Sequence, residues 1–316
     1  MLLADKTEKF RITSKELVGS KGTILNSFNE VIYCDQTPNY SESFGFQWNK
    51  FQTTQLDRFQ SGQKQSHDRF FAVTKWNEED LTHQNVLEVG SGAGRFSSIV
   101  LNNTNANLVS VDYSHAVEAN FRNNGPHPRL RLFQASIYDL PFEPAQFDKV
   151  FCFGVLQHTP DVKHSVECLT QMVKPGGTLI VDFYQIKGWY TKIHAKYLLR
   201  PITRKWDHTK LLNTIESNAD RLIRLYRGLN RIGLGFLTRF LPVCDINRTL
   251  PKNLSPEQLH EWVVLDTFDM FSPAFDQPQQ LEEVVKWFKE FGLVNVSGQM
   301  VTYDGVNQVA VVKGTR

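Results

Sequence analysis

The residues best suited to chemistry begin with a glycine-rich stretch, Glu88–Arg95 (EVGSGAGR), which follows an apolar run. Glycines after a strand let the backbone approach a ligand, and N–H groups at the start of the next helix point toward it. The third glycine is Gly94 and position 95 is Arg95, so the spacing differs from the dinucleotide fingerprint G-x-G-x-x-G. The stretch therefore predicts a ligand-binding loop and disfavours a nicotinamide oxidoreductase.

A second candidate is Asp112, which ends the next apolar run and stands 22 residues after Gly90. A carboxylate at this place can accept hydrogen bonds from both ribose hydroxyls of a nucleoside. The alternative is that Asp112 only caps the helix that follows. With the glycine-rich loop in front of it, Asp112 favours the nucleoside role.

His158 is the candidate for proton transfer, in the run Gln157-His158-Thr159-Pro160-Asp161 after the fourth apolar run. A histidine there could take a proton from an attacking hydroxyl or amine. The alternative is that His158 only positions its loop, with Thr159 or Asp161 capping the next helix. Asp182 and Tyr184 would face the same cleft, and we expect Asp182 to be structural.

The elements that must position these residues alternate between short apolar strands and helices. Strands are predicted at 85–90, 108–112, 130–135, 147–154 and 178–184, with helices at 94–102, 114–123 and 161–173 and a turn at 175–177. The alternation resumes with a helix at 279–291 and strands at 293–301 and 308–313. Asp304-Gly305 between these last strands is typical of a hairpin. The pattern predicts an α/β fold whose sheet is mostly parallel with an antiparallel edge.

Five ordered segments carry a family resemblance: EVGSGAGRFS, SVDYS, QASIYDLPF, FDKVFCFGVLQHTPD and KPGGTLIVDFY. They resemble the motifs of class I S-adenosylmethionine (SAM)-dependent methyltransferases, in the subgroup similar to ubiquinone/menaquinone-biosynthesis enzymes. The likeness covers 85–184 well and 279–313 loosely. It implies a seven-stranded Rossmann-like sheet with a reversed last strand and SAM at the carboxyl ends of strands one, two and four. Residues 44–57 also resemble a lead-in of bacterial relatives often found with surface-sugar pathways.

The resemblance also implies which residues hold the cofactor. They are Glu88, Gly90, Ser91, Gly92, Gly94, Asp112, Tyr113, Ser136, Ile137 and Phe153. The glycine-rich loop would line the methionine and ribose, Asp112 would hold the ribose with Tyr113 stacking nearby, and Ser136 would flank the adenine with Ile137. Phe153 would lie on the sulfonium side. Many relatives carry an acid where this chain has Ser136, whose hydrogen bond is weaker.

Around this predicted core, the chain divides into an N-terminal segment and an insertion. We expect 1–80 to form an N-terminal cap, 81–185 and 276–316 the SAM-binding core, and 186–275 a helical insertion. In the aromatic-rich cap, Phe46, Trp48 and Gln55 could close over SAM, or they could be core residues under the sheet.

The insertion is basic in an otherwise acidic chain: from Ile186 to Arg248 it carries 13 Lys and Arg against 4 Asp and Glu. Within 221–232, helical spacing places Arg221, Arg224, Arg227 and Arg231 on one face, and Leu222, Leu225, Tyr226, Leu229 and Ile232 on another. This face could be merely solvated, or it could meet a phosphate-bearing acceptor, an anionic membrane surface or RNA. RNA ranks last, since no nucleic-acid module is present. We expect an acceptor lid that recognises an anionic acceptor.

Composition limits the remaining classes of function. The first ten residues are charged and lack an apolar core, so we expect no secretory signal, and no run is long enough to span a membrane. The four cysteines are far apart, which predicts neither disulfides nor a metal site. We therefore expect a cytoplasmic enzyme that methylates a small-molecule or glycan- or lipid-linked acceptor. The alternative is a SAM-binding regulatory or scaffolding protein without transferase activity.

Overall fold

The computed structural model describes residues 2–5, 8–12, 17–25, 30–35, 37–60, 64–186, 188–303, 305 and 307–316. These residues form two compact units. The core unit comprises Met1–Gln185, Phe275–Asp304 and Gln308–Arg316, and the insertion unit comprises Ile186–Ala274 and Gly305–Asn307. Asp304, half of the predicted hairpin turn, lies outside the described residues.

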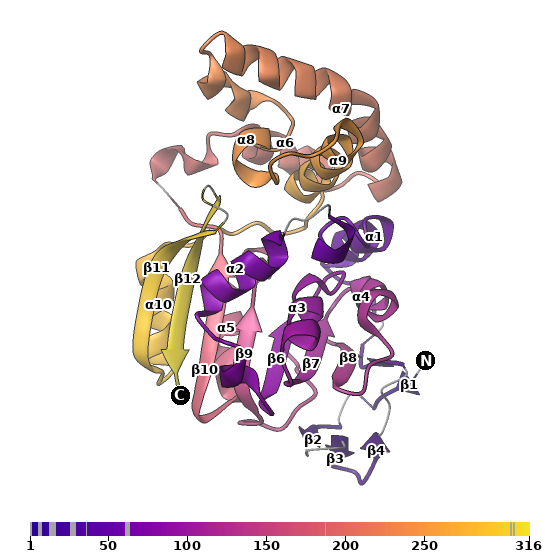
Figure 1. Ribbon diagram of the computed structural model, residues 1–316, viewed down its shortest axis with the longest axis vertical. Helices are drawn as coiled ribbons and strands as arrows, with labels where there is room; N and C mark the ends of the chain where they lie inside the picture. The colour runs from indigo at the N-terminus through magenta and orange to yellow at the C-terminus, as the bar shows by residue number, and fades with distance from the viewer. Residues whose placement is uncertain are drawn as a thin grey trace. The chain divides into compact units, whose positions relative to one another are not determined.

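The core unit is built on one mixed sheet (Figure 1) in the order β1-β5-β8-β7-β6-β9-β10-β12-β11. Its main strands are β6 (Asn85–Val89), β7 (Asn107–Asp112), β8 (Leu130–Gln134), β9 (Phe147–Cys152), β10 (Val173–Phe183), β11 (Val294–Tyr303) and β12 (Asn307–Thr315). β8, β7, β6, β9 and β10 pair in parallel, whereas β12 runs antiparallel to β10. The predicted α/β fold with an antiparallel edge is confirmed.

The sheet differs from the prediction at two places. Among the described residues, β1 (Leu2–Leu3) and β5 (Val31–Tyr33) extend the sheet beyond β8 to nine strands, where seven were predicted. The sequence did not reveal these two strands, because two or three residues are too few to show strand periodicity. β10 also begins at Val173, before the predicted turn at 175–177. That stretch is instead an irregularity inside the strand, where the register against β9 shifts between Val173 and Thr178.

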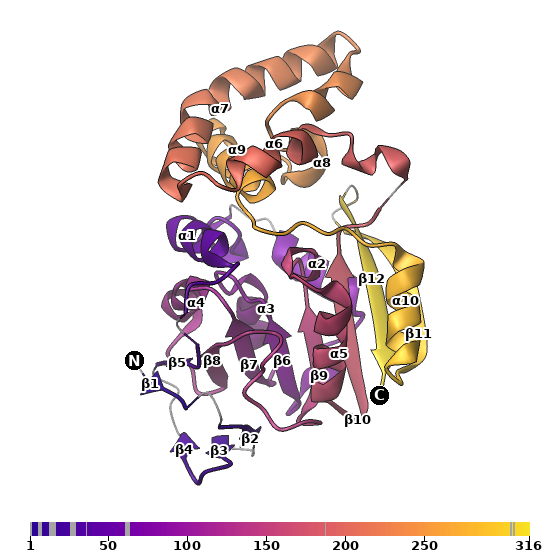
Figure 2. The same cartoon turned by 180° about the vertical axis from the view of Figure 1, so that it is seen from behind.

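Helices cover both faces of the sheet (Figures 1 and 2). On one face lie α2 (Gln65–Thr74), α3 (Arg95–Asn103) and α4 (Ala116–Asn124), with α1 (Glu42–Lys50) against α4. On the other lie α5 (Val162–Met172) and α10 (Leu281–Glu290). Because side chains alternate along a strand, Leu87 and Val89 pack with the α5 and α10 side, whereas Val86 joins Phe70 and Phe96 on the other. Glu88 therefore faces α3.

Several short elements complete the core unit. The strands β2 (Phe10–Ile12), β3 (Leu17–Gly19) and β4 (Ile24–Leu25) form a small antiparallel sheet. Three short 3₁₀ helices among the described residues also belong to this unit: η1 (Asp57–Phe59), η2 (Glu79–Leu81) and η3 (Leu156–His158). The turn η3 follows β9 at the carboxyl edge of the sheet and carries the predicted proton acceptor.

The insertion unit is helical. It contains η4 (Trp189–Lys192), α6 (Ala195–Thr203), α7 (His208–Arg231), η5 (Gly235–Phe240), α8 (Ile246–Thr249) and α9 (Pro256–Phe271). α7 begins at an Asp207 cap, and α9 begins with a capping box between Ser255 and Gln258. No helix among the described residues is long and apolar enough to cross a membrane.

The predicted apolar face of α7 is partly wrong. The helix buries Leu211, Leu212, Ile215, Ala219, Ile223 and Tyr226. Leu225 and Ile232, which we expected on that face, are 49% and 67% exposed. The buried face of α7, which contacts α9, starts before residue 221 and continues at spacings of three and four through Ile223. The prediction used only residues 221–232 and therefore placed the apolar face at a different angle around the helix.

Candidate functional site

The glycine-rich loop joins β6 to α3 and is built from left-handed backbone. Gly90, Gly92 and Gly94 have φ values of +83°, +53° and +83°, which side-chain-bearing residues rarely adopt. A Cβ on Gly90 would lie 2.1 Å from Val155, and one on Gly94 would lie 2.1 Å from Asn120. Packing alone therefore requires two of these glycines.

Gly92 has a different neighbour. A Cβ there would lie 3.0 Å from Nε1 of the Trp48 indole, which comes from α1. The structure thus brings an aromatic side chain of the N-terminal segment beside the loop. Gln55 from the same segment accepts a hydrogen bond from Nη1 of Arg95, 3.0 Å away, at the start of α3.

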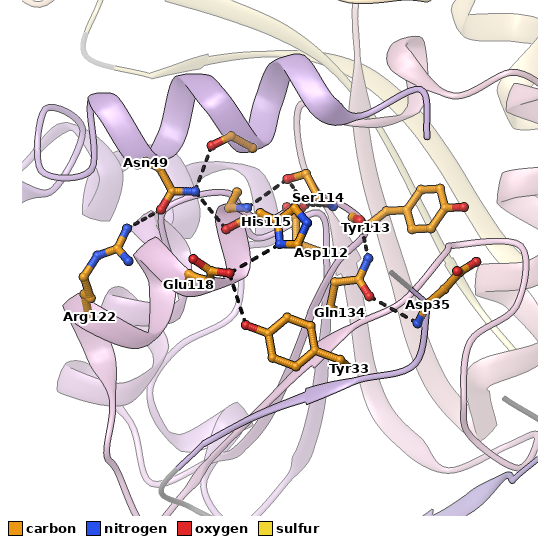
Figure 3. A network of polar contacts seen from close by, with 12 residues as sticks. Tyr33, Asp35, Asn49, Asp112, Tyr113, Ser114, His115, Glu118, Arg122 and Gln134 are labelled. Carbon is orange, nitrogen blue, oxygen red and sulfur yellow. Dashed lines mark hydrogen bonds and ion pairs between the residues drawn. The ribbon is translucent and has the colours of Figure 1, made fainter. Parts of the chain in front are cut away.

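Asp112 at the end of β7 holds the loop. Its Oδ2 accepts from the backbone N–H of Gly92 at 2.8 Å. Its Oδ1 accepts from the N–H and hydroxyl of Ser114 at 2.8 and 2.7 Å (Figure 3). Burial raises the pKa of the Asp112 carboxyl, and these hydrogen bonds oppose that shift. An ionised carboxylate has about four acceptor positions, so Oδ2 keeps one for a ligand hydroxyl.

Glu88 belongs to a buried network under the helices. Its Oε2 accepts from the hydroxyls of Ser97 in α3 and Ser110 in β7, the latter at 2.8 Å. Asn120 of α4 donates to the Ser97 hydroxyl at 2.9 Å. Burial raises the pKa of Glu88 to about 7. The described hydrogen bonds of Glu88 therefore run to the sheet and α3 rather than toward the loop, and its predicted contact with methionine stays a prediction.

Tyr113 lies close to Asp112 at the carboxyl end of β7. Its carbonyl oxygen accepts from the side chain of Gln134 at 2.7 Å (Figure 3), and its ring centroid lies 5.4 Å from that of Tyr40. Burial raises the pKa of the Tyr40 phenol, and the nearby Asp112 carboxylate adds to this shift. Sequence reasoning missed Tyr40, because no motif marks it.

The remaining predicted cofactor residues have different surroundings. Ser136 is partly exposed, and its hydroxyl accepts from the N–H of Tyr138 at 3.2 Å. Ile137 is buried in the core on the α5 side. Phe153 packs edge-on against Phe96 at 5.4 Å in the aromatic core under α2 and α3. Of these residues, Ser136 is the most open to a ligand.

Ser91 fits a bound polar ligand. Its hydroxyl is buried and has no hydrogen-bond partner within the described part of the chain. An unpaired buried hydroxyl costs roughly 1–3 kcal/mol, which a ligand atom placed in the loop would recover. This hydroxyl, the spare position on Asp112 and the left-handed loop together suit a nucleoside that carries an amino-acid portion.

His158 is buried, with 4% of its surface exposed. Its Nδ1 lies 3.0 Å from the carbonyl oxygen of Phe275, and because a carbonyl only accepts, Nδ1 carries the proton. In the neutral ring Nε2 is then the acceptor. The rings of Phe44 and Tyr184 flank the imidazole at 4.9 and 5.7 Å. Asp161 caps α5, as one of the alternatives predicted.

Gln157, beside the histidine, was missed from the sequence. Both polar atoms of its side-chain amide are buried without a hydrogen-bond partner among the described residues. An amide offers two donors and two acceptors, so this group can pair with a polar ligand. A glutamine between apolar and loop residues gives no signal that separates it from a surface residue.

Asp182 anchors a second polar cluster at the ends of β9 and β10. It is fully buried, pairs with Nη2 of Arg69 at 2.6 Å, and accepts from the N–H of Gly154. Burial, aided by the neighbouring Arg69, lowers the pKa of Arg95 to about 10. The contacts of Asp182 with Arg69 and Gly154 join α2 to the sheet, which agrees with the structural role expected for Asp182.

The described residues hold no group of three or more metal-ligating side chains.

Comparisons with known proteins bear on the same segment. Residues 87–181 match a family described as a methyltransferase domain. The chain is 30% identical over 131 residues to the ubiquinone biosynthesis O-methyltransferase of Methylococcus capsulatus, covering 39% of this chain and 54% of that protein. It is 29% identical over 120 residues to the tRNA U34 carboxymethyltransferase of Nautilia profundicola, covering 36% and 40%.

A solved structure, a complex of the Haloferax volcanii Trm112 methyltransferase activator with a methyltransferase, is similar with a TM-score of 0.49 and 12% identity, covering 89% of this chain and 99% of that one. The chain spans between 28% and 40% of the length of three of the curated relatives that it matches.

Proposed function

We propose that this chain, whose residues 87–181 form a class I SAM-dependent methyltransferase domain, methylates a hydroxyl or amine of a small-molecule or glycan- or lipid-linked acceptor. One observation carries the proposal. Inside the matched segment, the carboxylate of Asp112 is hydrogen-bonded to the loop at Gly92, and the buried His158 follows the next strand but one. A nucleoside-binding edge and a proton acceptor therefore come from the same sheet.

Different residues at this edge would bind different parts of the cofactor. Oδ2 of Asp112 would accept from a ribose hydroxyl, and the hydroxyl of Ser91 would pair with the amino-acid portion. Trp48, beside Gly92, would cover the loop and exclude water. When bound, SAM supplies a sulfonium methyl group that is already electrophilic.

The chain must then align the acceptor and remove its proton. In the neutral imidazole of His158, Nε2 would take the proton, and the Nδ1–H bond to the carbonyl of Phe275 would fix the ring and stabilise the charge that forms on protonation. The amide of Gln157 would hold a polar group of the acceptor. Alignment for in-line attack supplies most of the rate enhancement, so no larger catalytic cluster is needed.

The anionic character of the acceptor is part of the proposal. A groove of about 290 Å³ in the insertion unit is lined by Asp220, Ile223, Arg224, Arg227, Leu254, Pro256 and Leu259. Arg227 makes no hydrogen bond or ion pair within the described residues, and Asp220 is engaged by His260 at 2.8 Å. Two arginines and four apolar side chains lining one groove would suit a phosphate or carboxylate on an organic acceptor. A cytoplasmic location also belongs to the proposal, supported by four free cysteines.

The test is methyl transfer from labelled SAM to pooled acceptors, with and without anionic groups, by the purified chain. Formation of S-adenosylhomocysteine that depends on an acceptor supports the proposal. Binding of SAM without turnover on any pool would favour the regulatory alternative. Binding of NADH in place of SAM would refute both.

A further inference from the structure

Helix α6 of the insertion unit has its polarity reversed. Arg200 is 5% exposed, and its Nε and Nη2 donate to the carbonyl oxygen of Pro273 at 3.2 and 2.7 Å. Leu198 and Ile202, four residues apart on one face of the same helix, are each 61% exposed. A helix on the surface of a water-soluble protein normally buries its apolar side and exposes its arginines. This exposed face therefore calls for a covering partner.

Exposed apolar side chains also occur in η4, which precedes α6 in the chain, and in η5. Trp189 in η4 is 85% exposed and Phe236 in η5 is 67% exposed. These turns lie side by side, because Arg239 of η5 donates to the carbonyl oxygens of Ile193 and Tyr190, each at 2.8 Å. We call the exposed apolar side chains in and next to η4, α6 and η5 together the apolar belt, and its members are Trp189, Tyr190, Ile193, Leu198, Leu199, Ile202, Leu234, Phe236 and Phe240.

The charges among these residues all have one sign. Residues 186–206 and 231–244 contain no Asp or Glu, whereas Lys192, Arg204, Lys205 and Arg231 are exposed there. Protein–protein interface cores are depleted in Lys, and a second copy would bring the same cations against these. Trp, Tyr and Phe interleaved with Lys and Arg are instead typical of a surface at the level of lipid headgroups.

We propose that the insertion unit docks on an anionic lipid bilayer through the apolar belt. The apolar side chains enter the headgroup region, and the surrounding cations meet lipid phosphates. α6 has nine residues, too few to span a membrane, so the association is peripheral. This inference concerns binding to lipid and does not depend on the methyl-transfer reaction.

The experiment is sedimentation of the full chain with vesicles of phosphatidylcholine alone or in equal parts with phosphatidylglycerol. We expect binding to the anionic vesicles, and a drop of at least about tenfold in partitioning for Leu198→Gln with Ile202→Gln. The matched control is Phe59→Gln with Val294→Gln, which removes side chains 53% and 56% exposed in the core unit and should bind as the natural chain does.

Two further measurements test the roles of the cations and of Trp189. Lys192→Gln with Lys205→Gln should weaken binding to anionic vesicles roughly tenfold or more. On anionic vesicles the tryptophan emission should shift to the blue, and Trp189→Phe should lose most of this shift while still sedimenting. Absence of vesicle binding by the folded chain, or equal binding by the Leu198 and Ile202 variant, would overturn the proposal. A dimer that this variant disrupts, without vesicle binding, would overturn it in favour of a second copy.

Discussion

The carboxylate of Asp112 accepts a hydrogen bond from the backbone N–H of Gly92 at 2.8 Å. Through this bond, the residue that we predict to hold a ribose also holds the loop that would approach the cofactor. The left-handed backbone at Gly92 turns its N–H toward β7, and the short run to Ser114 brings two further donors to the same carboxylate. Asp112 therefore has a structural duty besides its predicted binding role, and a test must separate the two.

Replacement of Asp112 by Ala should weaken SAM binding by roughly 1–3 kcal/mol, the range for hydrogen bonds to a charged group. Isothermal calorimetry measures this affinity directly. Ser114→Ala is the matched control, because it removes one donor to the carboxylate but keeps the acceptor. If Asp112→Ala bound SAM as tightly as the natural chain, the ribose assignment would be wrong. Equal losses in both variants would leave Asp112 a purely structural role.

Glu88 predicts a pH dependence of stability. Its folded-state pKa is raised from 4.5 to about 7 by burial, so the folded chain keeps a proton that the unfolded chain releases. Stability should therefore fall as pH rises from about 4.5 to about 7, by roughly 3 kcal/mol at most. In Glu88→Gln this component should be absent. Urea unfolding of both chains at several pH values in this window gives the difference, and a difference that does not change with pH would contradict the prediction.

His158→Ala should lower turnover by about 100-fold or more while SAM affinity changes little, if the imidazole is the base. The matched control for loop positioning is Thr159→Ala, which removes the hydrogen bond from the Thr159 hydroxyl to the carbonyl of Leu156 but leaves the imidazole. Turnover rates at saturating acceptor decide between the roles. Unchanged turnover in His158→Ala, or an equal loss in both variants, would reduce His158 to a loop residue.

The groove in the insertion unit allows a charge-matched test. Arg224 and Arg227 line it, whereas Arg221 and Arg231 lie on the same helix without lining it. Arg224→Gln with Arg227→Gln should raise the acceptor KM roughly tenfold or more and reduce its salt dependence. Arg221→Gln with Arg231→Gln loses the same charge and should leave KM near its natural value. Equal effects in both pairs would indicate long-range charge rather than a site, and no effect in either would exclude the groove as an acceptor site.

The sequence predicted those parts of the fold that rest on local patterns. The strands β6, β7 and β9 are short and mostly apolar, so their positions were found within a residue or two. β1 and β5 were missed because they are too short to have a period. A helix was predicted within 221–232, and its apolar face was partly right: Tyr226 is buried as expected, whereas Leu225 is exposed and Ile223 is buried instead. The buried residues of α7 depend on the elements packed against it, which sequence spacing within one helix does not report.

The candidate site was predictable only where a motif marks it. The pairing of Arg69 with Asp182 spans 113 residues of sequence and became visible only in the structure. The same holds for Trp48 beside Gly92 and Tyr40 beside Tyr113, because both contacts depend on how the N-terminal segment packs on the core. The direction of Glu88 toward α3 follows from strand alternation, which outweighs its nearness to the loop in sequence.

The most direct measurement of the central claim is calorimetric titration of SAM into the natural chain and Gly92→Val. The branched side chain would occupy the space between the loop and Trp48 at a backbone φ of +53°, so binding should be lost. Gly176→Val is the matched control, since Gly176 has a φ of +79° with no atom near its Cβ. Circular dichroism checks that both variants are folded. Tight binding by the natural chain and by Gly176→Val, with none by Gly92→Val, is the predicted result, and normal SAM binding by a folded Gly92→Val would contradict the account.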